Sequence, residues 1–153
     1  MRFTFRAGYI FKAGLAMVLT LLFVNGCFVD LVRHENNEII LESNKQWYVS
    51  KITFKDGTEI SPVWEEAKSN MNFNVNENRI FGISVCNNYF ATFTLKGNKL
   101  KVSNIGSSRR MCFPNESMRY EYMFLKYLQG DFIVNKKDGK IRLEGQEATY
   151  YLQ

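Results

Sequence analysis

The sequence predicts an α+β fold: a strongly curled, largely antiparallel, barrel-like β-sheet with one main helix packed on it. Short segments rich in aromatic and β-branched residues recur from residue 46 onward, with turn dipeptides between them. One segment with helical periodicity interrupts them at residues 116–129. Strands, one helix and strands again are typical of α+β proteins. Short strands joined by tight turns favour closure of the sheet over a long exposed edge.

The first predicted strand, residues 47–54, runs into Asp56-Gly57, a pair that accepts the positive φ of a type I′ hairpin. Residues 70–78 then alternate between apolar residues and asparagines, which predicts a half-buried strand. Further turns are expected at Gly97-Asn98 and Asp138-Gly139. The remaining predicted strands are residues 79–84, 89–95, 99–104, 132–134, 141–143 and 149–152.

The helix is predicted over residues 116–129. Asn115 is expected to cap its N-terminus, and Glu116 lies in the first turn, where a negative charge complements the helix dipole. Gly130 supplies a C-terminal stop. Apolar residues recur at spacings of four and three, and we expect this stripe to pack against the sheet rather than to face a membrane or a partner. The stripe consists of Met118, Tyr122, Leu125 and Leu128.

The N-terminal residues indicate export. A basic leader precedes an apolar run at residues 13–24, and the small residue Gly26 comes directly before Cys27, which is typical of a secretory signal. The run is shorter than the roughly 20 residues that a membrane-spanning helix needs. A cysteine at this point resembles the lipobox of bacterial lipoproteins. The resemblance implies a signal peptide at residues 1–26 and acylation of Cys27, for example by palmitate.

The same resemblance implies a location. Lipoproteins of this kind are held on a membrane of the cell envelope by their N-terminal lipid, and an Asp after the cysteine commonly retains them in the inner membrane. Phe28 stands at that position here, which favours the outer membrane with the protein facing the periplasm. Residues 27–43 are expected to be a tether, and the folded domain is expected to span residues 44–153.

The net charge argues against nucleic-acid binding, and the length indicates a single domain. Residues 1–26 hold three of the 20 basic residues and none of the 15 acidic ones, so the remaining chain has a net charge of +2. Because the basic pairs are scattered, nothing predicts the clustered basic face that nucleic-acid binding needs. The remaining 127 residues are enough for one domain.

Two cysteines remain if Cys27 carries lipid. Cys86 and Cys112 would then form an even pair in a compartment that permits disulfides. A bond between them would close a loop of about 27 residues, worth about 3.5 kcal/mol in the chain-entropy model. The alternative is a pair of buried thiols, which are common in protein cores. We favour the disulfide.

The same two cysteines carry a second resemblance. The segment from Gly82 to Tyr89 has the pattern Gly-x-x-x-Cys-Asn-x-aromatic, and Ser108-Arg-Arg-Met-Cys112 follows it. Together with the early Trp47-Tyr-Val segment, these residues resemble the META domain of the bacterial HslJ heat-shock lipoprotein family over nearly all of residues 44–153. The resemblance implies a role in the bacterial envelope, in stress response or in antibiotic tolerance, with no general catalytic activity.

The residues predict neither a catalytic site nor a metal or cofactor site. The only histidine, His34, falls in the tether, so Cys86 and Cys112 lack partners for zinc, and no serine has a histidine in the folded domain as its base. Asn87 is expected either to cap a turn or to bind a ligand. Arg109, beside the second cysteine, forms either a basic contact site or part of a solvated loop.

These observations predict a non-enzymatic, lipid-anchored envelope protein. We expect it to support envelope integrity or stress and antibiotic tolerance through contacts with another envelope protein. One alternative is a periplasmic carrier of a small apolar ligand, because a curled sheet can enclose a pocket. Another is a protease inhibitor or chaperone-like module that presents a loop. The carrier hypothesis predicts a cavity lined by Phe73, Phe81, Tyr89 and Phe93.

Overall fold

The computed structural model describes residues 41–43, 45–62 and 68–153 of the chain. In chain order its elements are β1 (Gln46–Phe54), β2 (Glu59–Ile60), β3 (Asn70–Asn74), β4 (Arg79–Ile83), β5 (Asn88–Lys96), β6 (Lys99–Ser107), α3 (Asn115–Leu128), β7 (Gly130–Lys137), β8 (Lys140–Gly145) and β9 (Ala148–Leu152). The predicted signal peptide, Cys27 and His34 lie outside the described residues.

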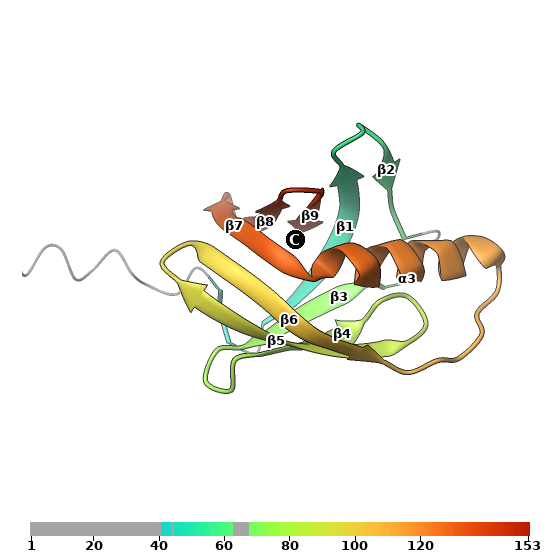
Figure 1. Ribbon diagram of the computed structural model, residues 1–153, viewed down its shortest axis with the longest axis horizontal. Helices are drawn as coiled ribbons and strands as arrows, with labels where there is room; N and C mark the ends of the chain where they lie inside the picture. The colour runs from blue at the N-terminus through green and yellow to red at the C-terminus, as the bar shows by residue number, and fades with distance from the viewer. Residues whose placement is uncertain (1–40, 44, 63–67) are drawn as a thin grey trace, which may run out of the picture. The chain divides into compact units, whose positions relative to one another are not determined.

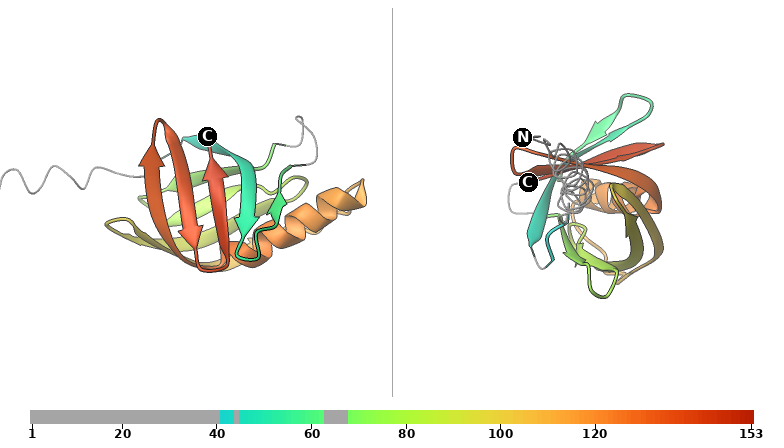
Figure 2. Two further views of the ribbon diagram at one scale, coloured as in Figure 1. Left: turned by 90° about the horizontal axis from the view of Figure 1, so that it is seen from above. Right: turned by 90° about the vertical axis from the view of Figure 1, so that its left-hand side faces the viewer.

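The strands form one antiparallel sheet that closes on itself. From β3 to β9 each strand pairs with the next one along the chain. β1 closes the sheet because it pairs with β3 along one edge and with β9 along the other. Strands β1 and β3–β9 therefore form an eight-stranded barrel, and the short β2 extends the sheet beside β1 (Figures 1 and 2). The predicted barrel-like antiparallel sheet with one helix is confirmed.

Each predicted turn dipeptide has at least one residue with a left-handed backbone. At Asp56-Gly57 that residue is Gly57 alone, so this turn is not the predicted type I′. Gly57 has a φ of +84° between β1 and β2, where the Phe54 N–H donates to the Thr58 carbonyl over 2.9 Å. Between β7 and β8, Asp138 and Gly139 have φ values of +51° and +72°. Successive positive φ values are those of a type I′ turn, whose twist matches that of the paired strands. These turns fix the register of the neighbouring strands.

Aromatic rings fill much of the barrel interior. Met71 and Phe73, alternate residues of β3, are fully buried, as the alternation predicts. Phe73 meets Phe93 of β5 edge to face, with 6.1 Å between ring centroids. Phe124 of α3 packs against Tyr150 of β9 at 5.5 Å, and the Tyr150 hydroxyl donates to the Phe124 carbonyl over 2.7 Å. Burial of this apolar surface is the main term that stabilises the fold.

The core includes residues before Asn44, where the sequence predicts the start of the domain. Leu41 is fully buried. Ser43 forms a β-bridge to Phe73, and its hydroxyl accepts a hydrogen bond from the Val75 N–H over 3.1 Å. The segment just before β1 therefore packs as part of the domain, although the prediction places it in the tether.

Helix α3 lies within one residue of its predicted bounds at each end, but its start differs in detail. Asn115 is the first helical residue and not the cap, because the N-cap position is held by Pro114, which makes no side-chain hydrogen bond. Glu116 is in the first turn, as predicted. The helix ends at Leu128, before Gly130, which opens β7 with a φ of +147°. Within the described residues, no helix has the length and apolar character to cross a membrane.

The buried face of α3 corrects the predicted stripe. Met118 is 36% exposed and Tyr122 is 62% exposed, so these two residues do not pack against the sheet. The buried residues of the helix are Ser117, Tyr120, Glu121, Phe124 and Leu128. Leu128 is fully buried as predicted, and Leu125 packs partly against the core. Met118 and Tyr122 instead lie one residue step, about 100°, from the buried positions Ser117 and Glu121. The reason is that Ser117 and Glu121 are buried despite being polar.

Candidate functional site

The turn between β4 and β5 places two polar residues inside the domain. Ser84 and Asn87 are 0% and 1% exposed, respectively. The Ser84 N–H donates to the Asn87 carbonyl over 3.0 Å, which closes the turn. Because β5 begins directly after this turn, the Asn87 side chain is fixed at one end of the barrel, beside the segment that follows β6.

Asn87 connects this turn to the chain that follows β6. Its amide oxygen accepts hydrogen bonds from the Ser108 hydroxyl and the Arg110 N–H, each over 2.8 Å. Its amide nitrogen donates to the Arg110 carbonyl over 3.0 Å and to Glu121 Oε1 over 2.7 Å. Both donors and both acceptor positions of the amide are therefore used. Of the two predicted roles of Asn87, this geometry fits the structural one, which here extends beyond its own turn.

Glu121 of α3 is the buried carboxylate of this cluster, and it is not among the candidate site residues predicted from the sequence. Glu121 is only 6% exposed. Its Oε2 accepts from the Ser84 hydroxyl over 2.6 Å and from the Asn87 N–H over 3.0 Å. A buried carboxylate is costly unless it is hydrogen bonded, and these donors offset that cost. We call Ser84, Asn87 and Glu121, with the backbone of Arg110, the Asn87 junction.

A disulfide joins Cys86 to Cys112 beside the junction, as the sequence favours. Its Cα atoms are 6.2 Å apart, within the ordinary range for a disulfide. The Arg110 guanidinium donates to the Cys86 carbonyl over 2.6 Å, which ties the same two segments once more. Arg109 is exposed and has no hydrogen bond or salt bridge within the described part of the chain. The structure thus places Asn87 at the centre of the cluster and Arg109 at its solvent-facing edge.

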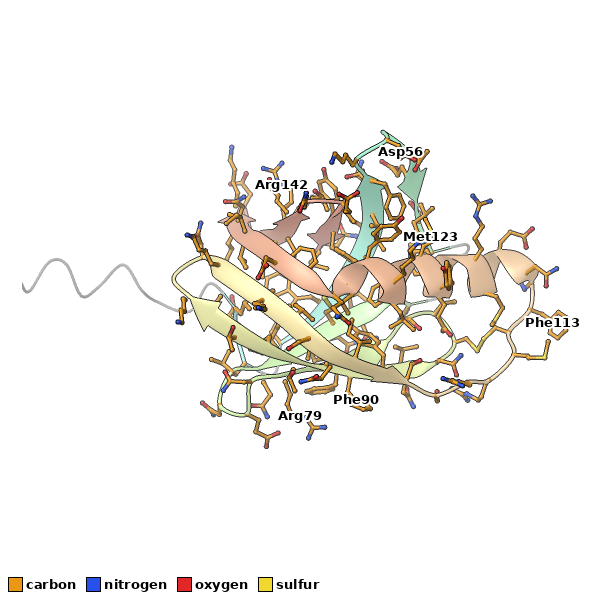
Figure 3. The ribbon with its side chains drawn as sticks, viewed as in Figure 1. Asp56, Arg79, Phe90, Phe113, Met123 and Arg142 are labelled. Carbon is orange, nitrogen blue, oxygen red and sulfur yellow. A yellow bond between two sulfur atoms is a disulfide. The ribbon has the colours of Figure 1, made fainter. Side chains whose placement is uncertain are left out.

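The loop between β6 and α3 presents apolar side chains to solvent. Met111 is 84% exposed and Phe113 is 82% exposed, on either side of the disulfide-bonded Cys112. Figure 3 shows Phe113 at the outer end of this loop, close to the start of the helix. The Cys112 N–H lies 3.3 Å from the sulfur of Met118, which brings the loop and the first turns of α3 together.

The chemistry of the junction is that of a structural cluster. Ser84 donates to Glu121 but is fully buried, so a substrate has no access to its hydroxyl. The described residues contain no histidine that could act as a base. Nor do they bring three or more histidine, cysteine or carboxylate side chains together around a position that a metal ion could occupy.

The residues predicted to line a ligand cavity do not form a common pocket. Phe73, Tyr89 and Phe93 are buried in the core, where Phe73 and Phe93 are in contact. Phe81 lies on the other face of the sheet and is 44% exposed. Two open grooves, of about 490 and 500 Å³, lie elsewhere. The surface of the first is half polar, whereas that of the second, which includes Leu100, Phe132 and Ile133 beside several lysines, is mainly apolar.

Comparisons with known proteins agree on the fold. The family model of the META domain matches residues 40–153. An NMR structure of a protein from Burkholderia xenovorans is similar with a TM-score of 0.59 at 20% identity, covering 72% of this chain and 83% of that one. A second NMR structure has a TM-score of 0.53 at 15% identity, covering 71% and 86%. No curated protein shows significant similarity to the chain.

Proposed function

Because the chain belongs to the META domain family, we propose that it is a non-enzymatic, lipid-anchored protein of the bacterial envelope. In this proposal Cys27 carries the lipid and holds the protein on the outer membrane, facing the periplasm. The META domain then supports envelope integrity and tolerance of stress or antibiotics by contacting another envelope component.

The observation that carries the proposal is the disulfide between Cys86 and Cys112. Structural disulfides persist in oxidising compartments such as the periplasm and are rare in the cytosol. The bond therefore supports export, which the apolar leader before Cys27 indicates independently. The buried hydrogen bonds of the Asn87 junction support a scaffold role, because Asn87 uses both donors and both acceptor positions of its amide within the protein.

The anchoring part is tested by labelling cells with a palmitate analogue and separating membranes by sedimentation. Wild-type protein should carry the label and sediment with membranes, because several acyl chains bind far more firmly than one. Cys27→Ser should lose the label. The double variant Cys86→Ser/Cys112→Ser is the matched control, since it removes two thiols but should keep the label. Unlabelled wild-type protein in the soluble fraction would rule out the anchor.

A second candidate function has its own observation. The loop that exposes Met111 and Phe113 has the form expected of a protease inhibitor or chaperone-like module, which presents side chains to a protein partner. A photo-crosslinking amino acid at position 113 in living cells, followed by mass spectrometry, would capture such a partner. The same group at Phe90, another exposed phenylalanine, is the control. A protein captured from position 113 alone would support this candidate.

A further inference from the structure

Among the residues that the structure describes, the three most exposed large apolar side chains are Met111, Phe113 and Tyr122, on the loop before α3 and on the helix itself. Met118, on the same helix, is 36% exposed. We call Met111, Phe113, Met118 and Tyr122 the tip patch. Met111 and Phe113 are more than 80% exposed, whereas exposed apolar residues of the sheet, such as Phe90 at 49%, are partly covered. Such patches commonly mark interaction sites, since exposing apolar groups to water is unfavourable.

The loop that carries Met111 and Phe113 of the tip patch is held in place by a disulfide and by Asn87. Cys112, between Met111 and Phe113, is bonded to Cys86. The backbone of Arg110 both donates to and accepts from the side chain of Asn87. The apolar side chains therefore project from a braced loop, so docking them onto a partner orders little additional chain.

The charges around the tip patch select the partner. Arg109, Arg110 and Arg119, which lie within three residues of tip-patch residues in the sequence, are exposed, and the Arg110 guanidinium also donates to the Cys86 carbonyl. Residues 109–122 contain two acidic side chains, and one of them, Glu121, is buried and occupied by Asn87 and Ser84. The exposed charge of this segment is therefore three arginines against Glu116, which suits a negatively charged surface.

We propose that the tip patch inserts into the headgroup region of an anionic lipid bilayer. Figure 3 shows Phe113 projecting at one end of the domain. Exposed apolar side chains with exposed arginines close to them in the sequence match a bilayer interface, where arginines reach phosphates while apolar groups enter the acyl boundary. The inference deepens the proposed function by naming lipid as the contacted envelope component, and it relies on that proposal for the domain's access to a membrane.

The test uses the full chain isolated from cells and reconstituted into phosphatidylcholine vesicles with or without phosphatidylglycerol. Phe113→Trp places a fluorophore at the tip, and Phe90→Trp places one on the sheet. The parent chain, with its two tryptophans, gives the baseline. Brominated lipids should quench the emission at position 113 and leave that at position 90 unchanged. Met111→Trp provides a second tip probe if Phe113→Trp does not fold.

The arginines give a second readout. On vesicles with phosphatidylglycerol, quenching gives the ratio of protein with its tip inserted to protein with its tip free. Arg109→Ser and Arg119→Ser should each lower this ratio by about fivefold, and by less at high salt. Equal emission with and without brominated lipid, in protein that keeps its disulfide, would overturn the proposal. So would equal quenching at positions 90 and 113, or a crosslink from position 113 to protein alone. Loss of the palmitate label with intact tip quenching would refute the anchor but not the tip contact.

Discussion

Asn87 binds both oxygens of the Glu121 carboxylate. Its backbone N–H donates to Oε2 over 3.0 Å, and its side-chain amide donates to Oε1 over 2.7 Å. This contact joins the β4–β5 turn to helix α3 across 34 residues of sequence, and the remaining amide atoms of Asn87 hold the loop between β6 and α3. One buried asparagine thus braces the segment that carries the exposed tip patch.

Glu121→Gln should destabilise the domain by about 2 to 3 kcal/mol. The substitution keeps the shape of the side chain but replaces one acceptor oxygen by a donor, which would face Asn87 or Ser84 donors inside the protein. Urea unfolding measures the effect. Glu116→Gln, on the exposed side of the same helix, is the matched control and should stay within about 0.5 kcal/mol of wild type. Equal stability of the two variants would contradict the role given to Glu121.

Removing the disulfide with Cys86→Ala/Cys112→Ala should lower the Tm by about 12 °C or more. The estimate follows from about 3 kcal/mol of lost loop constraint in a domain of this size. Differential scanning calorimetry measures the shift, and non-reducing peptide mapping of the wild-type protein should recover Cys86 linked to Cys112. Quantitative reaction of both thiols with a maleimide in protein isolated without reductant would show that no bond is present.

Phe124→Ala and Tyr122→Ala should separate the two faces of α3. Phe124 is fully buried and packs against Tyr89 and Tyr150, so its truncation should cost about 3 to 5 kcal/mol. Tyr122 is largely exposed, and its truncation should change the free energy of unfolding by no more than about 0.5 kcal/mol. If Tyr122→Ala lowered the free energy of unfolding more than Phe124→Ala does, the face predicted from the sequence, which contains Tyr122, would be the buried one.

Stability should fall above about pH 10, the ordinary pKa of tyrosine. Burial raises the pKa of Tyr89, Tyr120 and Tyr150 above that value. Above pH 10 the unfolded chain therefore releases protons that the native state retains, and each such tyrosine lowers stability by about 1.4 kcal/mol per pH unit. Urea unfolding across this range, with tyrosinate absorbance as a second signal, measures the loss. A free energy of unfolding that is constant from pH 8 to 11 would contradict the predicted loss of stability.

The barrel could be predicted because its signals are local. Alternation at Met71 and Phe73 identifies a half-buried strand, and pairs such as Asp138-Gly139 specify tight hairpins. The face of α3 could not be predicted in the same way. Apolar residues lie on two sides of this helix, and the buried side includes Glu121, whose hydrogen-bond partners are far away in sequence.

Part of the candidate site could likewise be predicted from the sequence, and part of it could not. The spacing of Cys86 and Cys112 and the position of Asn87 were visible in the sequence, because the family pattern includes them. Glu121 begins a segment that also resembles the family, but no role was predicted for its carboxylate. The predicted stripe of Met118, Tyr122, Leu125 and Leu128 placed Glu121 outside the buried face, and only the structure shows that Glu121 lies on the buried side with Tyr120 and Phe124.

The most direct test of the account is the intact mass of the protein purified from host membranes without reductant. The account predicts a chain that begins at Cys27 and carries acyl chains, with Cys86 and Cys112 lacking their thiol hydrogens. Fragmentation of the ion should place the added lipid mass on the first residue. A chain that retains residues 1–26, or one that begins at Cys27 without lipid, would contradict the central claim that this META domain is held at a membrane of the envelope.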